Sequence, residues 1–512
     1  MPVDSRQLPE GRVGLADVCL VLEGTYPFVL GGVSSWVHQL VRDLPELTFH
    51  LWVIVADEAA AQRDPVYELP ANVVGIDVVP LRAQPRRGAP ERAVEGWARM
   101  LPDLTSALIG RGRSSFGAAL ARRAETGWPA VPPRLVLAHP LAFEHLQKVY
   151  ASEAVHESFQ RFFWTWVNSL TPVLELLGAG LPPARVYHSV TTGYAGLLAA
   201  RARHETGRPM LLTEHGIYTK ERRIEVGQAR WIESADDGRV LASRRPPYFR
   251  QWWSRMFEGM SQLSYAAAAE ILTIHHGNTA LQLADGADER RLRVVPNGVD
   301  AGRIIAAAEA APRRAADAPF CIGFVGRVAP IKDLETLLDA VALVRLELPE
   351  VRLRILGPTD EDPEYCARCA QHAERLGLAG SVTFEGPVDV AQALPTLDAL
   401  VLTSVSEAQP LVLLEAGAAG IPAVATDVGA CRELLQGRSG ADRALGPAGF
   451  LTPIGAPRAT ADALLRLARD PALRQSFGAA GRARVTRFYA AGSMLAAYRA
   501  TYARWLGMGE AA

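Results

Sequence analysis

A stretch near residue 400 predicts a complete strand–helix–strand unit. Residues 399–402 form an apolar run typical of a buried strand, and residues 411–419 are good helix formers. Gly420 then stops the helix, and residues 421–426 form a second apolar run. Because parallel strands need such a helical crossover, we expect a parallel sheet in this part of the chain.

Two carboxylates belong to this unit, Glu407 and Glu415, eight positions apart. Glu407 follows the first strand, and Glu415 lies in the helix. In open α/β sheets, ligands bind outside the carboxyl ends of the strands. Two acids at this spacing are compatible with a general acid and base, or with two unrelated side chains, so their role depends on the rest of the chain.

The same alternation occurs near the start of the chain. Residues 17–22 predict a strand, Gly31 and Gly32 a turn, and residues 34–44 an amphipathic helix that Ser34 could cap. The backbone N–H groups of such a turn and the dipole of the helix favour an anionic group. An ordinary turn between a strand and a helix has the same pattern.

The length of 512 residues favours two domains over one. We expect an α/β protein with two doubly wound, Rossmann-like domains that face each other across a cleft. The first domain is predicted at 1–300 with a helical insertion at about 81–160, and an Ala-, Arg- and Pro-rich linker follows at 301–319. The second domain is predicted at 320–488, and an amphipathic C-terminal helix at 489–512 would pack back on the first domain.

The composition limits the classes of partner. A formal net charge of −1 gives no electrostatic reason to expect a nucleic-acid partner. The first residues include Asp4, Arg6 and Glu10 without an apolar core region, so we expect no signal peptide. No apolar run approaches the roughly 20 residues of a membrane-spanning helix. With five scattered cysteines, which suit a reducing compartment, these features predict a cytoplasmic protein, and peripheral membrane association stays open.

Two short motifs raise the question of a metal. Cys366 and Cys369 form a C-x-x-C, but no second cysteine pair or suitably spaced histidine accompanies them. Residues 360–362 form an acidic D-x-D in a polar loop flanked by prolines, where acidic side chains are commonly solvated. We therefore expect neither a metal nor a cofactor, and a D-x-D metal site is the chemical rival.

Arg327 and Lys332 are five positions apart, one after a predicted strand and the other at the start of the next helix. Lys332 is one of only three lysines in the chain. The helix dipole disfavours a lysine at a helix N-terminus, and a bound anion would supply a reason for it. Two cations at this spacing suit a diphosphate. A surface arginine beside a helix-start lysine is the simpler interpretation.

Two histidines, His188 and His215, fall at the ends of predicted strands in the first half. One such histidine is usually structural, whereas two at one sheet edge are equally compatible with a structural and a functional role. A charged run begins at Tyr218 and includes Lys220, and such a run is normally a solvated face. Aromatic residues cluster at 162–166, and clusters of this kind more often lie in a core than on a partner surface.

The chain contains the motifs F-V-G-R-V-A-P-I-K-D, V-P-N-G-V-D and S-E-A-Q-P-L-V-L-L-E-A. These are similar, in that order, to the G-R-x4-K phosphate clamp, the N-G-V-D turn and the E-x7-E helix of the GT-B-fold family 4 glycosyltransferases, which the chain resembles over nearly its whole length. Two segments of the first half look like the glycosyltransferases of bacterial Pel exopolysaccharide synthesis. They are L-E-G-T-Y-P-F-V-L-G-G-V-S-S-W-V-H-Q-L and T-E-H-G-I-Y-T-K-E-R-R.

The resemblance implies roles for the matching residues of the second domain. The donor-binding residues there would be Arg327, Lys332, Pro410, Leu411, Val412 and Glu415. Arg327 and Lys332 would hold the donor diphosphate, and Glu415 the ribose. Glu407, as a catalytic residue, would contact the transferred sugar. Many members have E-G-F-G where this chain has E-A-Q-P at 407–410, which leaves the preferred sugar open.

The resemblance also implies roles in the first domain. Gly31 and Gly32 would let the backbone approach the donor phosphates, and His215, the second catalytic residue, would contact the donor sugar. On the acceptor side would lie His188, Tyr218 and Lys220.

The activity implied by the resemblance is a retaining, metal-independent transfer of a hexose or N-acetylhexosamine. The sugar would move from a UDP-sugar to a growing exopolysaccharide, with the leaving phosphate helping to deprotonate the acceptor on the same face. The expected partners are the UDP-sugar, the polysaccharide acceptor and membrane-embedded synthase subunits.

Two alternatives stay open. A non-catalytic subunit could bind a UDP-sugar and scaffold a membrane synthase complex. A GT-B-type epimerase or phosphorylase is the enzymatic rival, although a phosphorylase needs a lysine for its pyridoxal Schiff base and this chain offers few.

Overall fold

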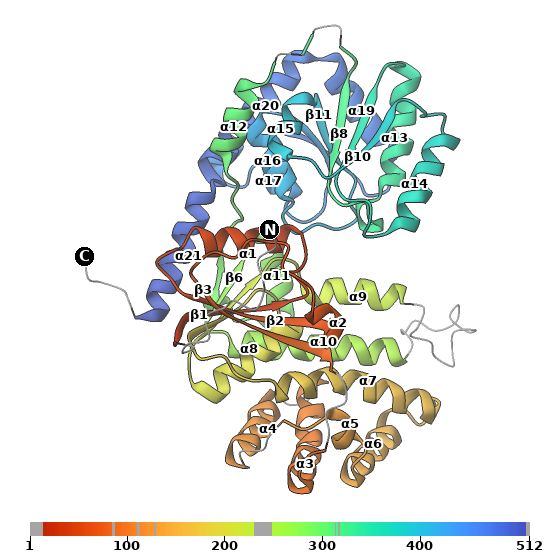
Figure 1. The fold of residues 1–512 in the computed structure, drawn as a ribbon. Helices are drawn as coiled ribbons and strands as arrows, with labels where there is room; N and C mark the ends of the chain where they lie inside the picture. Colours follow the sequence, from red (N-terminus) through yellow and green to blue (C-terminus); the bar gives the residue numbers. More distant parts are fainter. Residues whose placement is uncertain are drawn as a thin grey trace. The chain divides into compact units, whose positions relative to one another are not determined.

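The computed structural model of the protein describes residues 14–83, 88–109, 113–126, 130–229, 248–312, 314–315 and 318–507. These residues form two compact units (Figure 1). The first comprises the described residues up to Thr273, then Thr279–Val294 and those from Arg499 on. The second comprises Ile274–Asn278 and Val295–Tyr498.

Within the described residues, seven parallel strands form the sheet of the first unit. Their order across the sheet is β3 (Val73–Arg82), β2 (Phe49–Asp57), β1 (Ala16–Glu23), β4 (Ala184–Ser189), β5 (Met210–Glu214), β6 (Glu270–Thr273) and β7 (Leu292–Val294). The central strand β1 is almost continuously apolar and buried, as expected for a parallel strand covered on both faces. The chain order reverses between β1 and β4, and ligands bind at such a switch point in open α/β sheets.

The helices of the first unit connect these strands and extend the core. They are α1 (Gly32–Arg42), α2 (Glu58–Ala61), α3 (Glu91–Leu108), α4 (Arg113–Thr126), α5 (Pro133–Leu137), α6 (Pro140–Glu153), α7 (Phe159–Gly178), α8 (Gly193–Thr206), α9 (Tyr218–Gln228), α10 (Tyr248–Ala267) and the second part of α11 (His276–Ala284), with a 3₁₀ turn at Glu289–Arg291. Figure 1 shows α3 to α6 gathered beside α7, outside the layer of the sheet. Of the region expected as a helical insertion at about 81–160, Leu81 and Arg82 end β3 and the following described residues include α3 to α6, whose apolar residues join the core of the sheet. Its description as an insertion stays a prediction.

The second unit repeats the architecture with six parallel strands in the part of the chain that the structure covers. Their order is β10 (Val382–Gly386), β9 (Arg352–Leu356), β8 (Cys321–Val325), β11 (Ala399–Leu402), β12 (Ala423–Thr426) and β13 (Gly449–Thr452). The helices are α12 (Ala301–Ala310), α13 (Leu334–Glu347), α14 (Pro363–Arg375), α15 (Val390–Ala393), α16 (Leu411–Ala419), α17 (Cys431–Gln436), α18 (Gly440–Arg443), α19 (Pro457–Arg469), α20 (Pro471–Phe488) and the first part of α21 (Ala491–Leu506), with 3₁₀ turns at Pro330–Lys332 and Leu394–Thr396. The predicted strand–helix–strand unit is confirmed as β11, α16 and β12. The predicted α/β fold with two Rossmann-like parallel sheets is also confirmed.

Two local expectations differ from the structure. Gly31, not Ser34, precedes the first helix, and Ser34 lies buried inside α1. Gly32 and Val33 are helical, so α1 begins two residues before the amphipathic pattern that was predicted from residue 34. The expected linker begins with α12, because alanines favour a helix and the Asp300 side chain caps it by accepting from the Arg303 N–H at 3.1 Å.

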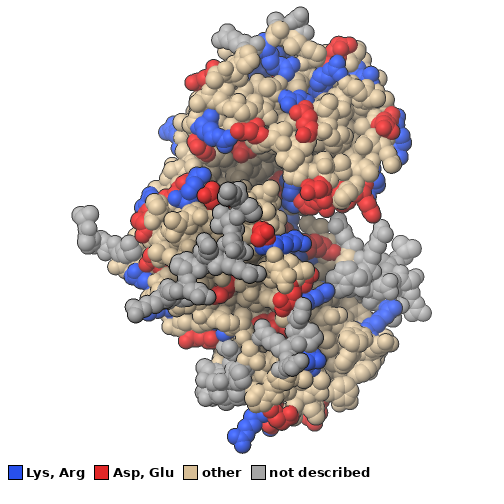
Figure 2. Space-filling view, in the orientation of Figure 1, with Lys and Arg blue, Asp and Glu red and all other residues tan. Residues whose placement is uncertain are grey.

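The aromatic cluster at the start of α7 is divided between core and surface. Phe162 and Trp166 are buried, whereas Trp164 is 54% exposed. On the face shown in Figure 2, basic and acidic side chains alternate without a large area of one sign. Among the described helices, none combines the length and the apolar character needed to cross a membrane.

Candidate functional site

The predicted donor residues of the second unit lie at its topological switch point. The sheet order reverses between β8 and β11. The turn after β8 carries Arg327, and the loop after β11 carries Glu407. Both loops leave the carboxyl ends of adjacent parallel strands, so they meet at one edge of the sheet.

Lys332 and Glu407 form the centre of this site. The Lys332 ammonium lies 2.6 Å from the Glu407 Oε1, and both side chains are mostly buried. The hydroxyl of Ser404 donates to the same carboxylate oxygen at 2.6 Å. Ser404 is fully buried and lies two residues after β11, but its contact depends on its rotamer and was not predicted from the sequence. The structure thus brings together a cation and a carboxylate that stand 75 positions apart.

Contacts to the backbone fix the segments that carry Lys332 and Glu407 beside each other. The Thr403 hydroxyl donates to the carbonyl oxygens of Lys332 at 3.0 Å and Asp333 at 2.9 Å. On the other side, Gly429 lies so close that a Cβ atom there would meet the Glu407 carbonyl oxygen at 2.1 Å. The loop that carries Glu407 is therefore fixed at both of its flanks.

Asp333 gives the turn after Lys332 an unusual backbone. Its φ is +47°, in the left-handed region that few residues other than glycine occupy. Its side chain caps α13 by accepting from the Thr336 N–H at 3.2 Å and the Thr336 hydroxyl at 2.7 Å. This capping stabilises the left-handed turn, which ends the 3₁₀ turn at Lys332. No sequence pattern pointed to it.

Glu415 lies on α16 and is half-buried. Burial raises the pKa of its carboxyl to about 7, while the Arg303 charge acts in the opposite direction. Within the described residues, no hydrogen bond or ion pair reaches this carboxylate. It is therefore a ready acceptor for a pair of hydroxyls, the role that the sequence resemblance implied.

The start of α16 offers backbone donors at the same edge. Pro410 is the N-cap, and Leu411 and Val412 are the first two helical residues, each half-buried. The N–H groups of a first helical turn have no partner inside their helix, and the dipole favours an anion there. This geometry is compatible with the donor-binding role predicted for all three residues.

Arg327 is not part of the Lys332–Glu407 cluster. Its guanidinium forms an ion pair with Glu361, and both side chains are almost half exposed. Glu361 is the central residue of the D-x-D at 360–362. The neighbouring Asp362 caps α14 by accepting from the Tyr365 N–H at 2.8 Å.

Gln409, at the point where the chain departs from the family's E-G-F-G pattern, has a structural partner. Its side-chain oxygen accepts from the Asn297 N–H at 2.7 Å, and Gln409 is 6% exposed. Asn297 belongs to the N-G-V-D turn. The residue thus ties that turn to the loop of Glu407, a contact that sequence reasoning missed.

In the first unit, Gly31 and Gly32 are exposed at the N-terminus of α1. A Cβ atom at either position would meet no atom of the described residues within 4 Å. Packing within the described residues therefore does not require these glycines. The prediction that they admit a phosphate is compatible with this open surface.

The two histidines of the first unit differ in their surroundings. His188 is fully buried, with Nδ1 2.6 Å from the Tyr502 hydroxyl and Nε2 2.8 Å from the Thr213 hydroxyl, and burial lowers its pKa to about 3. These contacts favour a structural role, and its acceptor-side role stays a prediction. His215 is 8% exposed, contacts Trp36 edge-to-face at 4.5 Å between ring centroids, and has a pKa lowered to about 4 by burial.

Tyr218 and Lys220 begin α9, directly after the loop that contains His215. Tyr218 is buried, and its hydroxyl lies 3.4 Å from a carboxylate oxygen of Glu23. Lys220 is exposed. The charged run is thus a solvated face only in part.

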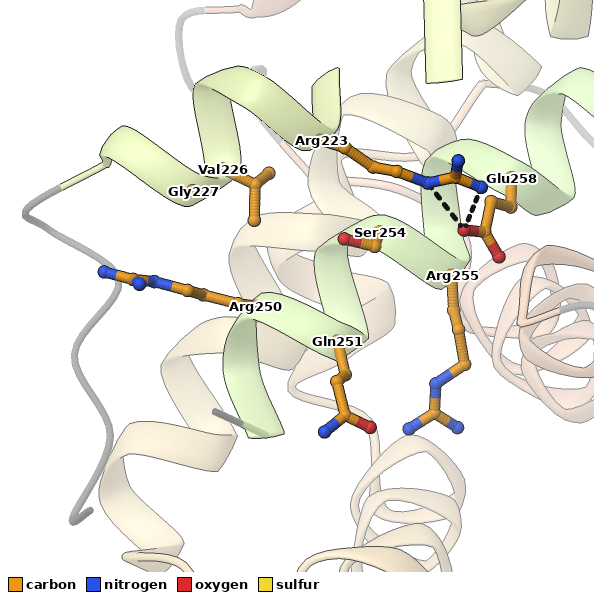
Figure 3. Close-up of a pocket in the computed structure, with 8 residues that line it drawn as sticks. All are labelled: Arg223, Val226, Gly227, Arg250, Gln251, Ser254, Arg255 and Glu258. Atoms are coloured by element: carbon orange, nitrogen blue, oxygen red, sulfur yellow. Dashed lines mark hydrogen bonds and ion pairs between the residues drawn. The ribbon is translucent and has the colours of Figure 1, made fainter. Parts of the chain in front are cut away.

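A cavity of about 520 Å³ lies between α9 and α10 (Figure 3). Arg223, Arg250 and Arg255 line it. Arg223 pairs with Glu258 at 2.9 Å, and Arg255 pairs with Glu153 at 3.4 Å. Figure 3 shows the three guanidinium groups pointing in different directions, so they do not converge on one anion. No sequence-predicted site residue lines this cavity.

Among the described residues, no group of three or more His, Cys, Asp or Glu side chains has the arrangement of a metal site. Cys366 and Cys369 are free thiols whose pKa values are raised by burial. The metal-independent mechanism stays a prediction that chelation can test.

Comparison with known families adds to this geometry. Residues 16–290, more than half of the chain, match the family described as "Domain of unknown function (DUF3492)". The chain belongs to this family. Residues 319–470 match the family described as "Glycosyl transferases group 1". The DUF3492 chain therefore carries a group 1 glycosyltransferase domain that contains Arg327, Lys332, Glu407 and Glu415.

Curated relatives of the DUF3492 chain match it over a limited length. The D-inositol 3-phosphate glycosyltransferase of Geodermatophilus obscurus is 36% identical over 200 residues, which cover 35% of this chain and 44% of that protein. The phosphatidyl-myo-inositol mannosyltransferase of Mycobacterium leprae is 33% identical over 201 residues, covering 38% and 49%. The chain thus spans about half the length of these relatives.

Solved structures show the fold over nearly the full chain. Anabaena HepE in complex with UDP has a TM-score of 0.58 at 15% identity, covering 95% of this chain and all of that one. Sucrose-phosphate synthase of Thermosynechococcus elongatus has a TM-score of 0.59 at 17% identity, covering 96% and 100%. The DUF3492 chain therefore has the GT-B fold.

Proposed function

We propose that the chain is a retaining, metal-independent glycosyltransferase that moves a hexose or N-acetylhexosamine from a UDP-sugar to a growing exopolysaccharide. The observation that carries the proposal is the Lys332–Glu407 contact of 2.6 Å at the switch point of the second sheet. A cation that neutralises a leaving phosphate and a carboxylate that contacts the sugar act on adjoining parts of one donor molecule, so they must belong to one site. This pair satisfies that requirement.

The proposed transfer uses the donor's own leaving group. The bond between the sugar C1 and the UDP oxygen breaks, and C1 forms a bond to an acceptor hydroxyl on the same face. The acceptor proton passes to the departing phosphate. Lys332 would stabilise the charge that grows on that phosphate, as a donor aimed at developing charge does. Glu407 would accept hydrogen bonds from the sugar hydroxyls.

UDP is the proposed nucleotide. Glu415 offers a half-buried carboxylate to a ribose diol, and Anabaena HepE, which has the same fold, has been solved with UDP and with UDP-glucose. The names of the inositol relatives give other acceptors, so our proposal for the acceptor is based on the sequence of the first half of the chain.

For the acceptor, we propose a Pel-type exopolysaccharide, with the chain acting as PelF. The support is the resemblance of its Leu22–Leu40 and Thr213–Arg223 segments to that class of enzyme. We further propose that it works in the cytoplasm, with membrane-embedded synthase subunits as partners and a peripheral place at the inner membrane.

A panel of UDP-sugars with an acceptor oligosaccharide tests the function. We expect UDP release and a lengthened acceptor with one hexose or N-acetylhexosamine donor, at the same rate with EDTA. Release that stops with EDTA would contradict the metal-independent mechanism. UDP binding in calorimetry without turnover, even with partner proteins present, would favour the non-catalytic scaffold instead.

A further inference from the structure

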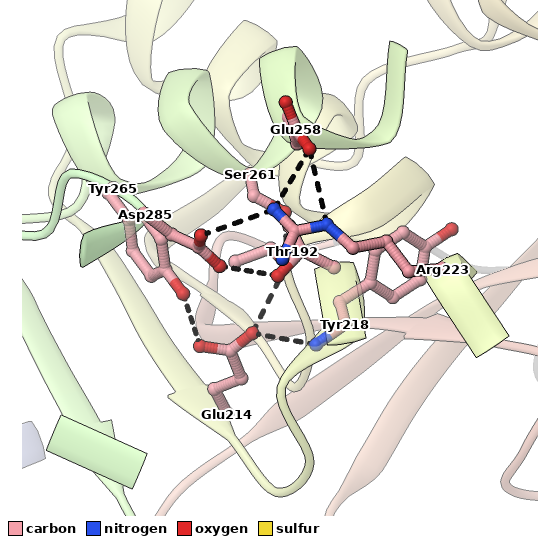
Figure 4. A network of polar contacts seen from close by, with 9 residues as sticks. Thr192, Glu214, Tyr218, Arg223, Glu258, Ser261, Tyr265 and Asp285 are labelled. Atoms are coloured by element: carbon pink, nitrogen blue, oxygen red, sulfur yellow. Dashed lines mark hydrogen bonds and ion pairs between the residues drawn. The ribbon is translucent and has the colours of Figure 1, made fainter. Parts of the chain in front are cut away.

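A buried carboxylate, Glu214, lies at the carboxyl end of β5, immediately before His215 (Figure 4). It is fully buried, and burial raises its pKa. The Tyr265 hydroxyl donates to its Oε2 at 2.6 Å, and the Gln282 side-chain amide donates to the same oxygen at 2.9 Å. Glu214 thereby connects β5 to α10 and α11.

The other carboxylate oxygen of Glu214 supports the start of α9. The Tyr218 backbone N–H donates to its Oε1 at 3.2 Å. Ile217, the N-cap of α9, makes no side-chain capping hydrogen bond. Glu214 therefore supplies the missing cap, and a carboxylate at a helix N-terminus is also favoured by the helix dipole.

The same oxygen accepts from the residue that precedes α8. The Thr192 hydroxyl donates to Oε1 at 3.3 Å, and Thr192 in turn accepts from the Ser261 hydroxyl at 2.8 Å. Because Ser261 supplies a proton to Thr192, the Thr192 hydroxyl proton is available to Glu214. All four groups around Glu214 can donate, so both carboxylate oxygens act as acceptors. The hydrogen bonds from Tyr265, Gln282 and Tyr218 lower the pKa of Glu214, against the effect of burial.

Tyr218 is fixed from a second side. Its hydroxyl points to Glu23 at 3.4 Å, and Glu23 also accepts from the backbone N–H groups of Tyr194 at 3.1 Å and Ala195 at 3.3 Å. The tyrosine ring lies directly over Gly193, where a Cβ atom would meet the ring at 2.3 Å. The buried Glu214 and the half-buried Glu23 thus hold the first residue of α9 at both ends, one through its backbone and one through its hydroxyl.

The next residues of α9 are anchored in the same way. The Thr219 hydroxyl donates to Asp285, and Arg223 lies 3.9 Å from Asp285 and 2.9 Å from Glu258. Figure 4 shows these contacts surrounding the N-terminal turns of α9. The exposed Lys220 projects from a turn whose backbone cannot shift without breaking several of them.

We propose that Glu214 is a positioning residue that fixes the segment from His215 to Lys220 for substrate contact. It does not touch the substrate itself. It determines the placement of His215, which directly follows it, and of Tyr218 and Lys220, through the cap of α9. This inference rests on the proposed glycosyltransferase function for its kinetic consequence, but the placement can be measured without turnover.

The variant Glu214→Gln tests the proposal with little change in shape. It removes the charge and turns one acceptor into a donor. Among the described residues, the buried Gln282 side-chain oxygen has no hydrogen-bond partner, so a rotation of that amide would accept the new N–H and let the variant fold. A matched control is Glu270→Gln on the neighbouring strand β6. Glu270 is also buried, but it accepts from Arg504 and Trp505 at the amino end of its strand.

Hydrogen exchange measures the placement. In Glu214→Gln we expect exchange about two- to fivefold faster in residues 215–228 only, the factor that corresponds to the energy of a charged helix cap. Glu270→Gln should leave that segment unchanged. Equal acceleration throughout the first unit in Glu214→Gln, or no acceleration at all, would overturn the proposal.

Kinetics measure the consequence. For Glu214→Gln we expect kcat/KM for the acceptor to fall on the order of tenfold or more, with unchanged UDP affinity. A wild-type protein without turnover would contradict the proposed function. The hydrogen-exchange result would then show by itself whether Glu214 fixes the segment from His215 to Lys220. An active wild type and an equally active Glu214→Gln variant would show that Glu214 does not position the site.

Discussion

Lys332 and Glu407 form an ion pair in which both members are mostly shielded from water. Removing one member of such a pair leaves the other charge without its partner. We infer that a bound diphosphate replaces Glu407 beside the ammonium and leaves the carboxylate oriented by Ser404 for the sugar. The pair would then link recognition of the phosphate to recognition of the sugar.

Replacing Lys332 with alanine removes the proposed phosphate partner. We expect turnover to fall on the order of 10²- to 10³-fold, the effect of losing one donor to a developing anion, while circular dichroism shows a folded protein. Lys148→Ala is the matched control, because Lys148 is exposed on α6. Wild-type turnover in Lys332→Ala would remove this lysine from the phosphate site.

Glu415 predicts a pH dependence of nucleotide binding. Its raised pKa of about 7 means that the carboxyl is protonated below pH 7 and accepts hydrogen bonds poorly there. UDP affinity should therefore increase as the pH rises from 6 to 8, by at most about tenfold per pH unit. Calorimetry on the wild type and Glu415→Gln separates this effect from the titration of UDP itself. Parallel pH profiles of the two proteins would rule out Glu415 as the ribose acceptor.

The sequence could predict those site residues that stand at regular positions relative to the predicted strands and helices. Glu407 was predicted after a strand and Lys332 at the start of a helix in an alternating pattern, and the structure places them in contact. Ser404, Gln409 and Asp333 could not be found in the same way. Their roles depend on a rotamer, on a turn distant in sequence and on a left-handed backbone, and none of these leaves a periodic signal.

At the scale of elements, the loop after β11 depends on the close approach of the turn after β12. Gly429 has a φ of +52°, and a side chain there would collide with the backbone of Glu407. The loop geometry is therefore set by packing between two neighbouring connections rather than by the loop's own sequence.

Gly429→Ala should displace Glu407. We expect a destabilisation of about 2–5 kcal/mol, the sum of a left-handed alanine and an overpacked contact, together with loss of turnover. Gly455 has a similar φ of +62°, and a Cβ atom there would meet no atom of the described residues within 4 Å, so Gly455→Ala carries the backbone cost alone. Denaturant unfolding of both variants measures the difference. Equal stabilities would show that the contact does not constrain the loop.

The elements themselves were largely predictable from the sequence. The inner strands β1, β8, β11 and β12 are nearly continuous apolar runs, because helices cover parallel sheets on both faces. The start of α1 and the helix α12 were not predicted. The helix α1 begins with a glycine, which usually marks a turn, and α12 is an Ala-rich segment whose composition resembles that of a linker.

At the scale of the whole molecule, each unit has its own core. The last turns of α21 belong to the first unit, where the Tyr502 hydroxyl bonds to the buried His188. The end of this helix therefore completes a unit whose other residues all precede Val295.

Tyr502→Phe removes that buried hydrogen bond. We expect the first unit to lose about 1–3 kcal/mol of stability, with turnover of the folded enzyme unchanged. Tyr67→Phe is a control in the same unit, since its hydroxyl makes an exposed contact with Ser35 at 3.3 Å. Scanning calorimetry resolves the effect if the two units unfold separately. A Tyr502→Phe variant as stable as Tyr67→Phe would show that this contact does not anchor α21.

The measurement that tests the central claim most directly is UDP release by the wild type and by Glu407→Gln at saturating UDP-sugar, with UDP affinity measured on the same preparations. Glu309→Gln, an exposed carboxylate on α12, serves as control. We predict that Glu407→Gln loses turnover on the order of 10²-fold or more while it binds UDP at least as tightly as the wild type. Turnover at the wild-type rate, or a loss of UDP binding instead of turnover, would contradict the account.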